Sequence, residues 1–186
     1  MNNFIFQNPT KLIFGKNTIS NLTKEIPLSS KIMITFGGGS VKKNNVYSQV
    51  TKALASHNYI EFWGIEPNPS VQTLRKAIAL GKENKVDFLL AVGGGSVIDG
   101  TKLISAALNF DGDAWELVRN PSLINEMTPY ASVLTLPATG SEMNRGAVIS
   151  NTETQEKYSF YSSYPKFSIL DPETTYTLPK FQISCG

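Results

Sequence analysis

The feature that most constrains the fold is a pair of Gly-Gly-Gly-Ser segments, each placed directly after a short, continuously apolar stretch. Residues 31–36 (KIMITF) precede Gly37–Ser40, and residues 87–92 (DFLLAV) precede Gly93–Ser96. Apolar stretches of this length are typical of strands that are buried on both faces of a parallel sheet. A strand that ends in glycines and leads into a helical pattern predicts the strand-to-helix turn of an α/β fold.

The rest of the chain repeats this alternation of apolar strands and amphipathic helices. We expect further strands at residues 61–65, 131–136 and 167–170, and helices at about 47–56, from an N-cap at Ser70 to about 84, and at about 97–108. Strands separated by helices predict an α/β fold, a Rossmann-like parallel sheet with helices on both faces. The first 20 residues predict one or two strands outside this pattern, from the apolar positions Phe4, Phe6, Leu12 and Phe14.

Composition excludes several classes of function. The 186 residues carry 17 basic and 15 acidic side chains, a net charge of +2 that is too balanced to predict a nucleic-acid partner. The N-terminus has no secretory signal pattern, and no segment has the roughly 20 apolar residues that span a bilayer. The single cysteine, Cys185, allows no internal disulfide. We therefore expect a cytoplasmic protein with neither a nucleic-acid nor a membrane partner.

Histidine usage bears on metal chemistry. His57 is the only histidine, and its small polar neighbours predict a solvated position in a loop or at a helix end. A catalytic zinc or iron site commonly uses two or more imidazoles from one chain. We therefore expect no metal ligand and no catalytic residue in this chain.

The second glycine triplet predicts an anion-binding turn. Glycine lacks a Cβ, so Gly94 and Gly95 allow the backbone to approach a ligand closely. The first amides of the following helix have no helical partner and point outward with the positive end of the helix dipole. Ser96 adds a hydroxyl or caps the helix, and Asp99, one turn in, can reach a ribose hydroxyl. The segment predicts a pyrophosphate cradle, and the alternative is a tight turn without a ligand.

The first glycine triplet bears on the choice between NAD and NADP. An NAD-selective site places an acid near such a strand end, where it accepts from the ribose diol. Here Gly37–Ser40 is followed by Val-Lys-Lys-Asn, and the loop contains no acid. Open amides, a hydroxyl and a lysine favour a 2′-phosphate, so the pattern indicates NADP. In the alternative interpretation Lys42 and Lys43 are solvated surface charges, which we expect for one of the two.

A third loop follows the strand at residues 131–136. Thr135, Thr139 and Ser141 offer hydroxyl groups without charge, which suits an amide-bearing ring that must be oriented. Threonine and serine are common wherever a strand meets a loop, so this segment alone is unspecific. Lys157 lies in a polar stretch, where it either reaches a cofactor phosphate or is simply exposed.

These loops, in this order and spacing, closely resemble the iron-containing alcohol dehydrogenase family, in particular its bacterial NADPH-dependent aldehyde reductases and butanol dehydrogenases. The matching segments span almost the whole chain: Phe14–Lys16, Gly37–Lys43, Gly64–Pro69, Gly93–Lys102, Thr135–Glu142 and Leu170–Pro172. The resemblance implies that residues 1–186 are one dinucleotide-binding domain.

The resemblance also implies which residues contact the cofactor, NADP(H). Those expected around the adenosine ribose and its 2′-phosphate are Gly37, Gly38, Gly39, Ser40 and Lys43, and those at the pyrophosphate and nearby ribose are Gly94, Gly95, Ser96 and Asp99. The nicotinamide end would be lined by Thr135, Leu136, Thr139, Ser141 and Asn144, and the remaining expected contacts are Asn68, Lys157 and Leu178. The first strands of such enzymes pair across a homodimer.

In the complete enzymes that the resemblance implies, an all-helical second domain supplies an aspartate and three histidines to iron, zinc or manganese. That metal polarises the carbonyl of a small aldehyde, and NADPH delivers hydride; the reverse reaction oxidises a primary alcohol. This chain ends before those ligands, and Asp171 matches a Leu-Asp-Pro turn instead. We therefore expect that this chain alone binds no metal and lacks catalysis.

Two other interpretations remain. The first is a free-standing, non-catalytic nucleotide-binding or assembly module, which the lack of metal ligands supports equally well. The glycerol dehydrogenase branch of the same superfamily is disfavoured by the acid-free first loop and by the Lys42-Lys43 pair.

Overall fold

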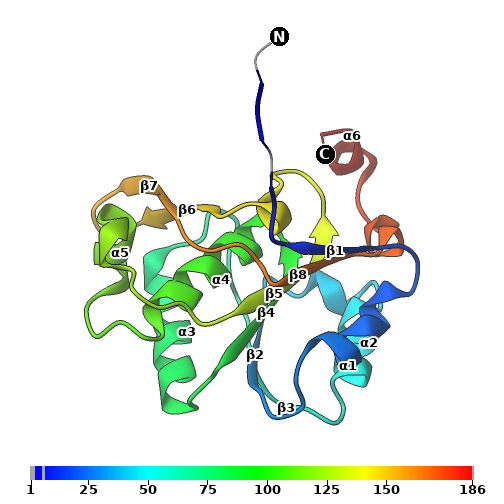
Figure 1. Cartoon of the computed structure of the whole chain (residues 1–186). Coiled ribbons are helices and arrows are strands. Elements are labelled where there is room, and N and C mark those ends of the chain that lie inside the picture. The colour runs from blue at the N-terminus through cyan, green and yellow to red at the C-terminus, as the bar shows by residue number, and fades with distance from the viewer. Residues whose placement is uncertain (1–2, 6, 186) are drawn as a thin grey trace.

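The computed structural model describes residues 3–5 and 7–185, and within them six parallel strands form a central sheet (Figure 1). In spatial order the strands are β1 (Lys11–Phe14), β8 (Phe167–Leu170), β5 (Tyr130–Leu136), β4 (Phe88–Gly94), β2 (Lys31–Phe36) and β3 (Asn58–Phe62). The expected strand at residues 61–65 lies slightly earlier, at β3, and the strand at residues 167–170 has the expected bounds.

Helices cover both faces of this sheet, which confirms the predicted Rossmann-like fold. Figure 1 shows α1 (Leu22–Glu25) and α2 (Val46–Ala53) on one side and α3 (Val71–Glu83), α4 (Gly95–Ala107) and α5 (Ala114–Arg119) on the other. Alternate strand residues serve the two cores, since Met33 packs toward α3 and α4 while Ile34 packs toward α2. Ser70 caps α3 as expected, because its hydroxyl accepts from the Thr73 amide at 3.3 Å.

The order of the strands places a switch point between β2 and β4. From β2 the chain crosses to β3 on one side, and it then returns to the other side of β2 to form β4, β5 and β8. Phe36 at the end of β2 is in register with Val92 in β4, so the loops that follow the two strands leave the same edge in opposite directions. In open parallel sheets this crevice is where ligands bind.

The N-terminal segment differs from expectation. Among the described residues before Lys16 only β1 is a strand, and it extends the main sheet instead of lying outside it. Lys11 pairs with Phe167 and Phe14 pairs with Leu170, both in parallel register. Phe4 precedes this strand and is exposed, and Phe6 lies outside the described residues. Pairing with β8 decides this placement, and the pattern of the segment alone contains no information about its partner strand.

The prediction that His57 is solvated is wrong. The ring is buried with 8% of its surface exposed, and its Nε2 lies 3.0 Å from the carbonyl oxygen of Ile26. The backbone at the end of α1 therefore lies against the imidazole. His57 is thus a core residue whose ring bonds to the backbone. The small polar residues beside it in the chain gave no indication of this burial.

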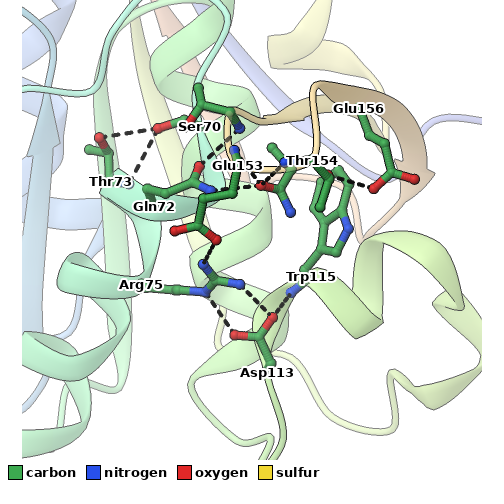
Figure 2. A network of polar contacts seen from close by, with 11 residues as sticks. Ser70, Gln72, Thr73, Arg75, Asp113, Trp115, Glu153, Thr154 and Glu156 are labelled. Atoms are coloured by element: carbon green, nitrogen blue, oxygen red, sulfur yellow. Dashed lines mark hydrogen bonds and ion pairs between the residues drawn. The ribbon is translucent and has the colours of Figure 1, made fainter.

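A second sheet was not expected from the sequence. Strands β6 (Gly146–Asn151) and β7 (Glu156–Tyr161) form an antiparallel hairpin beside α3, α4 and α5. Figure 2 shows polar contacts that fasten its turn: Arg75 makes two bonds of 2.8 and 2.9 Å to Asp113, and Glu153 lies 3.7 Å from the same guanidinium. Gln72 bonds to Asn151 at 2.7 Å.

Short helices complete the described chain: η1 (Thr18–Asn21), η2 (Ser40–Lys42), η3 (Pro121–Leu123), η4 (Ser141–Met143), η5 (Pro172–Thr175) and α6 (Lys180–Cys185). Across the described ranges, none of the helices combines the length and the apolar character that crossing a membrane would require.

The packing of α4 against α3 leads to a stability prediction. A Cβ on Gly100 would lie 2.9 Å from Leu74 Cδ2 and 3.2 Å from Ile65 Cγ2. Overpacking costs about 1–3 kcal/mol, whereas alanine gains about 1 kcal/mol of helix propensity over glycine. We expect Gly100→Ala to lower the free energy of unfolding by about 1 kcal/mol in urea denaturation.

Leu74→Ala provides the control for this steric explanation. In the Leu74→Ala background the nearest atom is gone, so Gly100→Ala should become neutral or stabilising. The same destabilisation in both backgrounds would show that the contact between α3 and α4 is not its cause.

Candidate functional site

The three loops singled out in the sequence leave the same edge of the sheet. They follow the carboxyl ends of the neighbouring strands β2, β4 and β5. Phe36 pairs with Val92, and Gly94 pairs with Leu136 across a shift in register. The residues expected to bind one ligand are therefore gathered along the crevice at the switch point.

The turn from β4 directly into α4 leaves little or no space for side chains on its glycines. A Cβ on Gly95 would overlap Thr139 Oγ1, and one on Gly94 would lie 3.2 Å from Leu136 Cβ. The loop after β5 therefore packs directly onto the start of α4. Gly94, the N-cap of this 13-residue helix, supplies no capping side chain, so the first amides of the helix are not covered by a side-chain cap.

The loop after β2 is open. A Cβ on Gly38 or Gly39 would have no atom within 4 Å, and Gly39 has a left-handed φ of 97°. The backbone of Gly37 is fixed by a hydrogen bond, because its carbonyl accepts from the Gly64 amide at 3.3 Å. Ser40 is exposed and begins η2.

The two lysines that follow this loop have different surroundings. The Lys42 ammonium lies over the Trp63 ring, 4.1 Å from its centroid, and 5.4 Å from that of Tyr47. Lys43 is exposed, and its amide donates to the Ser40 carbonyl at 2.9 Å. Lys42 is therefore held by an aromatic cluster, and Lys43 is the lysine beside the glycines without such a contact among the described residues.

Three expected residues from distant parts of the chain form a connected set. The Asn68 amide donates to Ser96 Oγ at 3.4 Å, and Lys157 Nζ donates to Asn68 Oδ1 at 2.8 Å. Asn68 has a left-handed φ of 56°, which asparagine tolerates better than most residues. The hairpin thus brings its lysine to the start of α4.

The expected nicotinamide end is organised around hydroxyl and amide groups. Thr139 Oγ1 and Ser141 Oγ lie 2.8 Å apart, and Thr135 is buried near the end of β5. Asn144 Nδ2 donates to the Gly140 carbonyl at 2.8 Å. Leu178 lies apart, in the turn after η5, where its amide bonds to the Thr175 carbonyl at 3.0 Å.

A hollow of about 500 Å³ lies beside this group. Asp99, Thr139, Ser141 and Asn144, all expected site residues, line one part of it. The other side comes from the hairpin and the residues that flank it, which sequence reasoning missed: Arg145, Gly146, Ala147, Val148, Ser159, Phe160, Tyr161 and Tyr164. The alternation of buried and exposed residues along 146–149 was a possible signal, but it is short.

Lys102 is the second feature that the sequence did not reveal. Its side chain is fully buried in α4, and its Nζ donates to Asn144 Oδ1 at 3.0 Å and to the Gly146 carbonyl at 2.6 Å. Asp99 Oδ1 lies 3.8 Å away. Burial lowers the pKa of Lys102 to about 8, against the opposing charges of Asp99 and Glu142.

Asp99 occupies the boundary between α4 and the hollow. Its Oδ2 accepts from the Val148 amide at 3.0 Å, whereas its Oδ1 is buried without a hydrogen-bond partner. Burial raises the pKa of Asp99, and the Lys102 charge and the Val148 amide oppose the rise. Asp99 Oδ1 therefore has the Lys102 ammonium at 3.8 Å as its charge partner, and the carboxylate is held at the wall of the hollow.

A family comparison identifies the fold that carries this site. The family model described as iron-containing alcohol dehydrogenase matches residues 9–172. The chain belongs to the iron-containing alcohol dehydrogenase family. The resemblance inferred from the glycine loops is thereby confirmed.

Individual relatives are similar over the whole chain. It is 50% identical to the NADPH-dependent aldehyde reductase YqhD of Escherichia coli, covering all of this chain and 49% of the relative. It is also 50% identical to the probable NADH-dependent butanol dehydrogenase 1 of Bacillus subtilis, with 97% and 48% covered. The crystal structure of Escherichia coli YqhD superposes with a TM-score of 0.94 at 50% identity, over 98% of this chain and 48% of that one.

The chain spans about half the length of the curated relatives it matches. Among its described residues, no group of three or more histidine, cysteine, aspartate or glutamate side chains is arranged to hold a metal ion. The site as described is therefore made of glycine loops, hydroxyls, amides, lysines and one aspartate.

The buried Lys102 predicts a pH dependence of stability. Its pKa of about 8 in the folded chain is below the 10.5 of an ordinary lysine, so between these values the unfolded state binds more protons. This group therefore makes the folded state more stable as the pH rises from 8 to 10.5. Relative to Lys102→Met, the free energy of unfolding of the wild type should rise by about 1–3 kcal/mol over that window.

Urea denaturation of both proteins at matched pH values measures this difference. Subtracting the free energy of unfolding of Lys102→Met from that of the wild type at each pH removes the contributions of the other titrating groups. A difference that stays constant or falls between pH 8 and pH 10.5 would contradict a lowered pKa for Lys102.

Proposed function

We propose that residues 1–186 form the NADP(H)-binding part of an alcohol dehydrogenase or aldehyde reductase. The observation that carries this proposal is the meeting of two glycine-opened strand ends at the switch point of a parallel sheet. One end leads into α4, and the other has open space and no carboxylate in its loop.

The described residues fit such a cofactor. The start of α4 at Gly95 and Ser96 offers amides and a hydroxyl to the pyrophosphate, and the Asp99 carboxylate, which lines the hollow, can accept from a ribose hydroxyl. Thr139 and Asn144 line the hollow where the nicotinamide would lie. Lys157 reaches the start of α4 through Asn68 and can contact a phosphate.

The preference for NADPH over NADH rests on the loop after β2. Residues 37–45 contain two lysines and no acid. The carboxylate of the next strand, Glu61, is engaged by the Tyr47 hydroxyl at 2.9 Å and by Trp63 Nε1 at 2.8 Å. Relatives of similar identity are named for NADH as well as NADPH, so the proposal depends on these side chains and not on the family.

The reaction proposed for the whole protein is hydride transfer between NADPH and a small aldehyde or primary alcohol. The names of the relatives as aldehyde reductase and butanol dehydrogenase support this substrate class. A divalent metal would polarise the carbonyl when bound, and the residues of this chain would bind and orient the cofactor. We further propose that this chain alone binds the cofactor without turnover of a substrate. The cytoplasmic location of the protein stays a prediction.

The alternative of a non-catalytic nucleotide-binding module shares the same binding site. Nicotinamide fluorescence measures NADPH binding under either interpretation, and aldehyde-dependent oxidation of NADPH by the complete protein separates the two. Absence of NADPH binding would contradict both.

A charge inserted into the first loop tests the cofactor preference. Ser40→Asp should weaken NADPH binding about tenfold or more, because a carboxylate beside the 2′-phosphate repels it, while NADH binding should change little. The isosteric Ser40→Asn is the control for shape. Equal losses for NADPH and NADH in Ser40→Asp would show that the 2′-phosphate does not bind at this loop.

We also propose that β1 pairs with a second copy of the chain. Within the described residues, β1 lies at the edge of the sheet with one strand beside it. The Lys11 amide donates to the Lys166 carbonyl just before β8, and the Gly15 amide donates to the Leu170 carbonyl at its end, at 3.2 Å each. The amide of Leu12 therefore faces away from the sheet. Leu12 and Phe14 are exposed by 48% and 70%, as an edge strand that joins another chain would be.

A proline in this strand tests the dimer proposal. Leu12→Pro removes the outward amide and leaves the bonds to β8, so it should convert a dimer into a monomer. Leu12→Ala keeps that amide and should remain dimeric. Light scattering after size exclusion gives the mass, and a monomeric wild type or a dimeric Leu12→Pro would contradict pairing through β1.

A further inference from the structure

Lys102 is a fully buried cation in a helix whose other buried positions are mostly apolar or small. A buried ammonium loses its hydration, so it is retained only where other groups compensate for that loss. Its described partners all belong to the wall of the hollow or to the loop that leads into it. They are the Asn144 side chain, the Gly146 carbonyl and, at 3.8 Å, Asp99.

The contact with Asn144 fixes the orientation of an amide. Asn144 Oδ1 accepts from Lys102 Nζ at 3.0 Å and from the Gly146 amide at 2.9 Å. Its Nδ2 donates to the Gly140 carbonyl at 2.8 Å. With the oxygen turned toward two donors, the nitrogen keeps one N–H for another acceptor.

The same lysine also links two parts of the site. Asp99 lies one turn before Lys102 on α4, and its Oδ2 holds the Val148 amide at 3.0 Å. Residues 144–148 are therefore attached to α4 at successive points by these two side chains. The helix that begins at the glycine cradle thereby sets the position of the loop on the other side of the hollow.

We infer that Lys102 is a positioning residue of the dinucleotide site, which orients the Asn144 amide and holds the Gly146 backbone against α4. This inference rests on the proposed function, since the ligand is the proposed NADP(H). Lys102 itself is covered by protein and does not touch the ligand. A lysine with a purely structural role would be replaceable by a methionine of similar volume without a specific loss of binding.

Binding of NADPH is measured by nicotinamide fluorescence for four variants. Lys102→Met removes the donor and should raise the Kd about tenfold, the effect of one lost charged hydrogen bond. Lys102→Gln has a similar volume and keeps an N–H donor, so it should recover part of the affinity. In an Asn144→Ala background, Lys102→Met should cause a smaller loss than in the wild type, because only the bond to the Gly146 carbonyl is left to remove.

Lys82→Met is the control, because the Lys82 ammonium also donates to a backbone carbonyl, that of Phe110, at a place remote from the loops. It should leave the Kd unchanged. Equal binding by wild type and Lys102→Met, or losses that simply add in the double variant, would overturn the inference.

Hydrogen exchange of the ligand-free chain gives a second readout. The Gly146 amide donates to Asn144 Oδ1, so Lys102→Met should accelerate its exchange more than that of core amides such as Val133. If Lys102→Met fails to fold, Lys102→Gln, which has a similar volume but lacks the ammonium, should still accelerate Gly146 exchange more than that of Val133. Unchanged Gly146 exchange in the variant would overturn the inference. If the wild type binds no NADPH but Gly146 exchanges faster in the variant, only the proposed function is refuted.

Discussion

The close packing of Thr139 on Gly95 is the constraint on which the edge of the sheet depends. It brings the loop after β5 to the first turn of α4, and any Cβ at Gly95 would separate the two. Because β2 and β4 are neighbours in the sheet, the same turn also lies beside the open glycines after β2. A cradle with free backbone groups therefore exists only because three strand ends meet where the direction of the chain reverses.

The hairpin is the other half of the site, and it is held at two ends. Its turn is fastened to α3 by the Gln72–Asn151 bond and by the ion pair of Glu153 with Arg75, which is itself paired with Asp113 at the start of α5. Its start is fastened to α4 by Asp99 and Lys102. The exposed ion pairs contribute little free energy individually, whereas the buried lysine has no solvent to replace its partners. The start of β6 should therefore be the more precisely placed end.

The sequence predicted the features that depend on local chemistry. The strand at residues 167–170, the Ser70 cap and the glycine turns follow from hydrophobic runs and backbone requirements within a few residues. It did not predict the β6–β7 hairpin, the burial of His57 or the role of Lys102, because each depends on partners far along the chain. A lysine in a helix is normally solvated, and only the loop at 144–146 makes this one internal.

The physics of cofactor choice explains why the family fold does not determine it. NADPH differs from NADH by one phosphate group, and its charge is screened in water within roughly 8–10 Å. In the proposed binding mode, only side chains near the loop after β2 lie close enough to this charge to favour or oppose it, and the rest of the sheet contacts NADH and NADPH alike. Two features of this chain act there in the same direction: the loop lacks an acid, and the carboxylate of Glu61 is already bonded to Tyr47 and Trp63. Lys42 is held over those same rings, which leaves Lys43 as the loop's more adaptable positive charge.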